Sequence, residues 1–318
     1  MNYISVKEVS EKWGVSQALV RRYCGQNRIP KAKHQNGTWL IPEKAEKPEK
    51  LGPAPNMPEL SPLAAKLVRQ KKKKNFHGLY DYIQINLTYS SCRMASSRLT
   101  REQVKSIFKK GKVRESFEPL KVSDLVEAMN HCACIDYILD HIQEPLTQKL
   151  VQHLHYILMF GTVDHRKNRV TPGVYRTEKA AGRGRPLLDP AKINSSLGAL
   201  LKEYEFQTDI GRTQILDFHV RFEEIFPFED GNGRIGRLIM FKECLRHNVM
   251  PFILDDKRRR QYLAGIQEWQ TNRMTLIQVV ASAQDRFEAQ VELQKLDENR
   301  PYEYMDEDGG EEDDYEDK

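Results

Sequence analysis

Apolar side chains recur every three or four positions along most of the chain, the spacing that collects them on one face of an α-helix. Two clear examples lie between residues 125 and 158, ahead of a glycine at 161. We therefore predict a mainly α fold for residues 63–290. Strand-like alternation is sparse there, and only residues 173–188, GVYRTEKAAGRGRPLL, are expected to form a small hairpin or flap. The helical periods are set by Leu125, Met129, Cys132, Ile135 and Leu139, then by Leu150, Leu154, Ile157 and Leu158.

A proline-rich segment, KPEKLGPAPNMPELSP (47–62), interrupts this pattern. Prolines prevent a continuous helix and favour a semi-extended chain, so the segment is predicted to be a linker. It separates a small N-terminal module, residues 1–46, from the larger helical unit.

Within that module, residues 4–24 predict two short helices around a tight turn, with Ser5 and Ser16 as caps and Gly14 at the turn. The next residues, RIPKAKHQNGTWLIP, predict two strands joined at the Asn-Gly pair 36–37. Two helices followed by a hairpin are typical of a winged helix-turn-helix. The stretch resembles the small DNA-binding domains of excisionases and MerR-type regulators, including the closing TWLIP.

This resemblance implies DNA as a partner. Gln17, Arg21 and Arg22 on the second helix are candidates for the major groove, and Lys31 and Lys33 are candidates for phosphate contacts. The alternative is a solvated basic face on a protein-interaction module. Because one module of this size neutralises few phosphates and binds weakly, DNA binding predicts a homodimer on paired half-sites.

Charge is distributed unevenly along the chain. Residues 303–318 carry ten acidic residues and one lysine, so the rest of the chain has a net charge of +14, although the whole chain has +5. A basic body with a short acidic tail indicates an anionic partner, nucleic acid or nucleotide. For the tail alone, a solvated segment without a partner is the alternative.

No apolar run is long enough to cross a bilayer and no signal-peptide pattern opens the sequence, so we expect a cytoplasmic protein without membrane contact. The five cysteines contain no CxxC pair, which fits a reducing compartment and no disulfide framework. The run His131-Cys132-Ala133-Cys134 lies in a helical pattern that points its side chains to different faces. This favours buried thiols over a metal site.

The stretch IFPFEDGNGRIGR, residues 225–237, has the character of an anion-binding loop. An apolar helical stripe leads into it, and Pro227 is expected to end that helix. Gly231, Asn232 and Gly233 then allow a turn that presents backbone N–H groups at the start of a new helix.

Charged residues complete this loop. Arg234 and Arg237 reinforce the N–H groups and suit the site to a polyphosphate, and Asp230 is a candidate ligand for Mg²⁺. The loop lacks a Lys-Ser/Thr pair and is therefore not a P-loop.

The same order of residues resembles the signature of the Fic-domain family, His-Pro-Phe-x-(Asp/Glu)-Gly-Asn-Gly-Arg-x-x-Arg. The resemblance implies a helical domain that binds ATP and Mg²⁺, with Phe228 among the nucleotide-site residues, and transfers AMP to a Ser, Thr or Tyr hydroxyl of a protein. It implies a regulatory helix within residues 63–117, a Fic core over 118–290 and a C-terminal extension over 291–318. The further segments that resemble the family are NLTYSSCRMASSRLTREQV (86–104), GVYRT (173–177), HVRFEEI (219–225) and SAQDRFE (282–288).

Phe226 stands where the family keeps the histidine that acts as general base. A phenyl ring accepts no proton, and general-base assistance is typically worth about 10²–10⁴ in rate. His219 lies two helical turns earlier, roughly 10 Å along the axis, so it is interpreted as structural rather than as a replacement.

The regulatory helix departs from the family pattern as well. Relatives carry (Ser/Thr)-x-x-x-Glu-(Gly/Asn), whose glutamate pairs with the second arginine of the signature and blocks the γ-phosphate of ATP. Aligning SCRMAS places Ser91, Ala95 and Ser96 at these positions, so Arg237 is expected to lose its glutamate partner. Two departures at two functional places are typical of a pseudoenzyme or of a deliberately altered sequence.

The sequence therefore predicts a winged-helix module followed by a Fic-type helical domain, with nucleotide and Mg²⁺ binding kept and AMP transfer lost or strongly impaired. The expected function is DNA-linked regulation with nucleotide as an effector. The alternatives are an active protein adenylyltransferase, acting on another protein or on itself, and a non-catalytic interaction scaffold.

Overall fold

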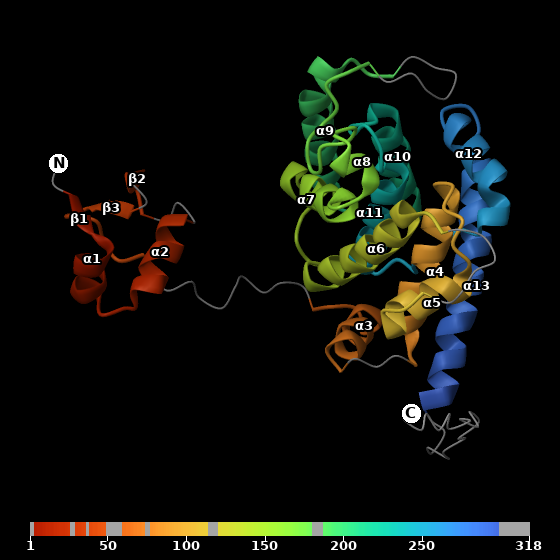
Figure 1. The fold of residues 1–318 in the computed structure, drawn as a ribbon, viewed down its shortest axis with the longest axis horizontal. Helices are drawn as coiled ribbons and strands as arrows, with labels where there is room; N and C mark the ends of the chain where they lie inside the picture. Colours follow the sequence, from red (N-terminus) through yellow and green to blue (C-terminus); the bar gives the residue numbers. More distant parts are fainter. Residues whose placement is uncertain are drawn as a thin grey trace, which may run out of the picture. The chain divides into compact units, whose positions relative to one another are not determined.

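The computed structural model describes residues 3–25, 29–35, 38–48, 59–73, 77–113, 120–179 and 187–298. The chain divides into two compact units, residues 1–59 and 60–318, and the division falls inside the proline-rich segment 47–62 (Figure 1). Each unit has its own apolar core.

The first unit contains two short helices against a small antiparallel sheet. Ser5 caps the first helix through a capping box with Glu8, and Gly14 ends it with a φ of 61°. A first strand that the sequence did not predict pairs with the last one, with Ile4 opposite Ile41, so the strand order is β1-β3-β2. The turn pair 36–37 lies outside the described residues. The elements are β1 (Tyr3–Ser5), α1 (Val6–Trp13), α2 (Gln17–Gly25), β2 (Lys33–Gln35) and β3 (Thr38–Pro42).

The second unit confirms the predicted mainly α fold. Its described residues contain no strand, and of the expected flap, residues 180–186 lie outside the described part of the chain. Helix α11 lies in the middle of this unit, where α10, α6, α4, α3 and α7 contact it (Figure 1). The elements are α3 (Pro62–Lys72), α4 (Leu79–Met94), α5 (Arg101–Lys110), α6 (Val122–Asp140), α7 (Gln148–Met159), α8 (Val163–Arg166), α9 (Pro190–Glu205), α10 (Arg212–Ile225), α11 (Asn232–Arg246), the 3₁₀ turn η1 (Asp256–Arg258), α12 (Arg259–Gln267) and α13 (Met274–Glu298).

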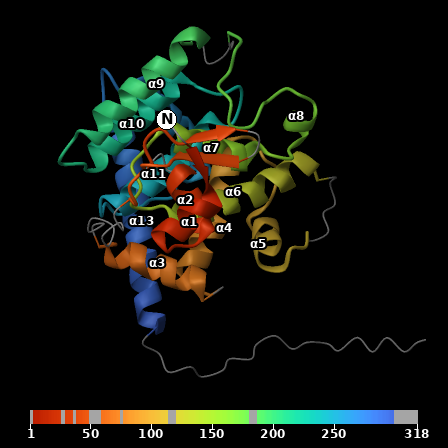
Figure 2. The ribbon, with the colours of Figure 1, turned by 90° about the vertical axis from the view of Figure 1, so that its left-hand side faces the viewer.

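Burial follows the position of each helix in this bundle. Nearly every residue of α11 is buried, because helices cover it on several sides. The final part of α13 extends past the helices that cover its first half, and Leu293 there is exposed (Figures 1 and 2). The central position of α11 places its first turn at a junction of several helices.

The two cysteines of the run 131–134 in α6 are buried, as the sequence predicted. His131 and Cys134 are fully covered and Cys132 is 8% exposed. Among the described residues, no group of three or more His, Cys, Asp or Glu side chains is arranged to hold a metal ion. Within the same part of the chain, no helix is both long and apolar enough to cross a membrane.

Candidate functional site

The loop between α10 and α11 is held in shape by Asn232. Its side-chain oxygen accepts a hydrogen bond from the Phe228 N–H (2.9 Å), and its amide group donates to the Phe228 carbonyl (2.8 Å). Gly231 has a φ of 82°, in the left-handed region that glycine adopts readily. A Cβ atom there would lie 3.3 Å from the His155 ring, so the position is also crowded. The chain thus turns sharply into α11, whose first N–H groups have no carbonyl partner within the helix.

His155 of α7 packs against this loop and was missed by sequence reasoning. Its ring stacks on Phe228 with centroids 3.7 Å apart. Nδ1 accepts from the Gly173 N–H (2.9 Å), so the proton is on Nε2, which donates to the Asp230 carbonyl (3.1 Å). Burial lowers the pKa of His155 to about 4. A neutral imidazole therefore joins the signature loop to the start of the flap segment.

Arg234 is a buried cation that carboxylates hold on two sides. It is 3% exposed and donates to Asp230 (2.8 Å) and to Glu127 of α6, a residue that sequence reasoning also missed. Burial opposes ionisation of Asp230, but the positive charge of Arg234 and hydrogen bonds from Gly231 and Arg234 outweigh it and lower the pKa of Asp230. The carboxyl group of Asp230 is about half exposed and remains a carboxylate at neutral pH.

Arg237 connects α11 to α4, which contains the segment predicted to be a regulatory helix. Its Nε donates to the Ser91 hydroxyl (3.0 Å) and Nη2 to the Ser91 carbonyl (2.9 Å). The absence of a side chain at Gly233 makes room for this guanidinium, since a Cβ there would lie 3.0 Å from its Nη1. Ser91 of α4 thus supplies two neutral acceptors to Arg237.

Ala95 and Ser96 follow directly on the last turn of α4, and both line the same cavity as Arg237. Ser96 has a φ of 74°, a conformation that residues other than glycine and asparagine rarely adopt. This backbone supports the alignment of Ser96 with the family's Gly or Asn position. In this alignment, the position of the family's glutamate corresponds to Ala95, which stays a prediction.

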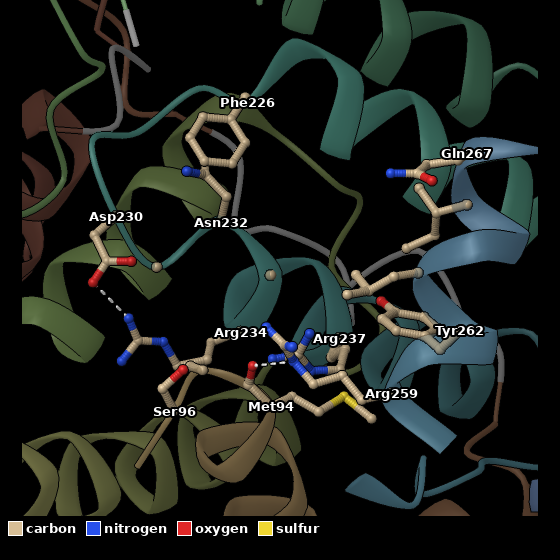
Figure 3. Close-up of a pocket in the computed structure, with 15 residues that line it drawn as sticks. Met94, Ser96, Phe226, Asp230, Asn232, Arg234, Arg237, Arg259, Tyr262 and Gln267 are labelled. Carbon is tan, nitrogen blue, oxygen red and sulfur yellow. Dashed lines mark hydrogen bonds and ion pairs between the residues drawn. The ribbon is translucent and has the colours of Figure 1, made fainter. Parts of the chain in front are cut away.

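Phe226 ends α10 with a φ of 49°, and Pro227 follows as predicted. Its half-buried side chain lines the cavity on the opposite side from Arg237 (Figure 3). Its carbonyl accepts from Nε of the buried Arg176 (2.7 Å), and the Arg176 N–H donates to the Pro227 carbonyl (2.9 Å). Through Arg176, the described part of the flap segment is fixed to the loop.

These residues enclose a cavity of about 460 Å³, within the range of small-molecule sites (Figure 3). The sequence-predicted residues Phe226, Asp230, Arg234 and Arg237 all reach it, together with the loop backbone. Phe228 is instead fully buried beneath the loop. Helix α12, which sequence reasoning did not connect with the site, supplies the other wall. Its lining residues are Arg259, Tyr262, Leu263, Ile266 and Gln267.

His219 does not line this cavity, in agreement with its structural interpretation. Its Nε2 is 2.5 Å from the Tyr262 hydroxyl, and its ring lies against the backbone of Gly236, where a Cβ would be 2.7 Å away. The Glu223 carboxylate lies close to the same glycine. Gly236, the last glycine of GNGRIG, thus allows α10 and α11 to approach closely.

For Mg²⁺, the described residues offer one suitable carboxylate, that of Asp230. A magnesium ion commonly uses one or two protein carboxylates, substrate phosphates and water. The site therefore fits Mg²⁺ that arrives with a polyphosphate, and Asp230 is the residue that would hold it.

In the first unit, four of the five candidates for DNA contacts have described side chains. Gln17 and Arg21 are exposed on α2 and contact each other (3.3 Å). Lys31, with a φ of 63°, and Lys33 are exposed before and on β2. The side chain of Arg22 lies outside the described residues.

Comparisons with known proteins agree with this geometry. Three solved structures share the fold. A Fic domain-containing signaling protein from Bacteroides thetaiotaomicron has a TM-score of 0.58 and 17% identity, and the match covers 75% of this chain and 91% of that chain. Fic-1 from C. elegans has a TM-score of 0.58 and 16% identity, with 74% of each chain covered, and a Fic family protein from Desulfovibrio desulfuricans has a TM-score of 0.52 and 18% identity, with 77% of this chain and 78% of that chain covered. No curated protein matches the sequence. Residues 145–244 match the model of the Fic/DOC family, so the chain contains a Fic/DOC domain.

Proposed function

We propose that the Fic/DOC domain binds ATP with Mg²⁺ in the cavity at the start of α11, and that AMP transfer from this nucleotide is lost or strongly impaired. In this proposal the nucleotide acts as an effector of a regulatory protein that contacts DNA through its first unit. The proposal rests on one observation: the anion-binding arrangement converges on the cavity, whereas a phenyl ring occupies the place of the family's general base.

Electrostatics support nucleotide binding. Arg234, Arg237 and the first N–H groups of α11 border one cavity and present partial or full positive charge to it. Asp230 and Glu127 compensate Arg234, whereas Arg237 contacts the neutral acceptors of Ser91. An anionic ligand is therefore favoured near Arg237.

Calorimetric titration with Mg-ATP tests this proposal. The unmodified protein should bind saturably, and Arg237→Ala should weaken binding by about 1–3 kcal/mol, the usual scale for a charge-assisted contact. Arg221→Ala is the matched control, because Arg221 pairs with Glu203 at the surface and does not line the cavity. Absence of saturable binding, or an equal effect of Arg221→Ala, would show that the preserved loop is only structural.

Asp230→Ala examines the metal separately. Because its carboxyl group is half exposed, its removal is expected to spare the fold and to weaken binding of Mg-ATP more than binding of ATP in a chelator. Equal effects in both conditions would argue against Asp230 as the Mg²⁺ ligand.

A second candidate function is an active protein adenylyltransferase. Ala95 favours it, because no side chain at this position reaches Arg237 to block the γ-phosphate. Phe226 argues against it, since the ring supplies no base and borders the space that an incoming hydroxyl would need. Incubation with labelled ATP separates the two, because only a transferase labels a protein, including itself.

DNA binding by the first unit is the remaining part of the proposal. The exposure of Gln17 and Arg21 on α2 and of Lys33 on β2 leaves these groups accessible to a duplex. The alternative is that this basic face contacts a protein, and salt-dependent retention of DNA distinguishes the two.

A further inference from the structure

Arg259, the first residue of α12, borders the nucleotide cavity but belongs to no part of the Fic signature. Its Nε donates to the carbonyl of Met94, the last residue of α4 (3.1 Å; Figure 3). The side chain thus reaches from α12 to the end of the regulatory helix, beside Ala95.

Most of the hydrogen-bonding capacity of this guanidinium is uncommitted. Arginine carries five N–H donors, and Arg259 uses one of them on a neutral carbonyl. No carboxylate of the described residues forms an ion pair with it, and the side chain is exposed. In contrast, Asp230 and Glu127 hold Arg234 on two sides.

The charge balance of the cavity favours a ligand with several negative charges. Asp230 and Glu127 offset Arg234, so Arg237 and Arg259 remain as two cations without a paired carboxylate among the described residues. A hydrogen bond from a guanidinium to a phosphate oxygen is roughly twice as strong as one between neutral groups. A phosphate oxygen therefore competes well with the Met94 carbonyl for Arg259.

We propose that Arg259 binds the polyphosphate of the nucleotide and exchanges the Met94 carbonyl for a phosphate oxygen when the nucleotide enters. This inference deepens the proposed function and rests on it. It also gives the nucleotide a direct link to the regulatory helix, because the carbonyl at the end of α4 loses its arginine when the cavity fills.

The test compares binding of ATP, AMP and inorganic tripolyphosphate to the full chain by calorimetry. Arg259→Ala should weaken ATP and tripolyphosphate binding about tenfold, since a charge-assisted contact is lost while the free protein loses only a neutral one. AMP binding should change less than about twofold, because Arg259 would contact the phosphates that ATP has and AMP lacks. Arg260→Ala is the matched control: it removes the same charge from the same helix at an exposed residue that does not line the cavity.

Arg259→Gln guards against a folding artefact, because glutamine keeps a donor for Met94 but has no charge. It should behave like Arg259→Ala toward ATP. The inference is overturned if the unmodified protein binds ATP and Arg259→Ala binds it equally well. It is also overturned if Arg259→Ala weakens the binding of ATP and AMP equally, or if Arg260→Ala weakens ATP binding as much as Arg259→Ala does. If the unmodified protein binds neither ATP nor tripolyphosphate, the proposed nucleotide function itself fails.

Discussion

Lowering the pH is expected to destabilise the second unit through His155. This ring is fully buried, and its Nδ1 accepts the Gly173 N–H, so a second ring proton would break that hydrogen bond. Its folded pKa is about 4, below the ordinary value of 6.5, so the unfolded chain binds the proton more readily. The contribution of His155 to the free energy of unfolding is therefore complete above pH 6.5, and it is lost as the pH falls from 6.5 to about 4.

The size of this effect follows from the two pKa values. Between about pH 7.5 and about pH 5, linkage gives a loss of about 2 kcal/mol in the free energy of unfolding from this one histidine. Urea unfolding at both pH values measures it in the unmodified protein and in His155→Phe. The variant keeps a ring to stack on Phe228 but cannot titrate. Its free energy of unfolding should therefore fall between the two pH values by about 2 kcal/mol less than that of the unmodified protein.

His153→Phe is the matched control, since His153 lies on the same helix but is exposed. It should leave the pH dependence of the unmodified protein intact. If His155→Phe loses as much stability between the two pH values as the unmodified protein does, His155 is not the source of the pH dependence.

Two further predictions concern DNA. Reversing the charge at Arg21 and Arg22 should abolish specific retention of the target DNA in a mobility-shift assay, and unchanged retention would reject α2 as the recognition helix. Deleting residues 303–318, which lie outside the described part of the chain, should tighten non-specific DNA binding at low salt, because nine net negative charges are removed from a basic protein. An unchanged affinity would show that the tail does not compete with DNA.

Much of the helical unit was predictable because its periodicity is local. The stripes around Ile135 in α6 and Leu154 in α7 gave the helices, and Pro227 gave the end of α10. Strand β1 was missed because only three residues form it and its pairing with β3 joins positions far apart in the sequence. Of the hairpin or flap predicted over residues 173–188, the described residues 173–179 and 187–188 form no strand, and the rest stays a prediction.

The candidate site was predictable only where residues are adjacent in sequence. Asp230, Arg234 and Arg237 share one loop and helix start, so their convergence followed from the pattern. His155 sits on an apolar helical stripe, and nothing local indicates that its ring meets Gly173 and the signature loop.

The same limit applies to residues brought in from other helices. Glu127 and Arg259 are charged residues among many on helix surfaces, and only tertiary packing brings them to α11 or the cavity. The left-handed backbone of Ser96 was not predicted either. Its alignment with a Gly or Asn position of the family could have indicated this conformation.

We propose that Phe226 alone removes the general base from an otherwise preserved site, and transfer of labelled AMP from ATP tests this. Phe226→His places an imidazole at a φ of 49°, a left-handed conformation in which histidine is enriched relative to bulky apolar residues. We expect this variant to label itself or a protein in lysate at least about 10²-fold faster than the unmodified protein. Phe226→Ala, which removes the ring without adding a base, should stay inactive, and adding Ala95→Glu to Phe226→His should suppress labelling through Arg237. Phe226 is not the cause of the lost transfer if the unmodified protein or Phe226→Ala labels as fast as Phe226→His, or if Phe226→His binds Mg-ATP and labels nothing.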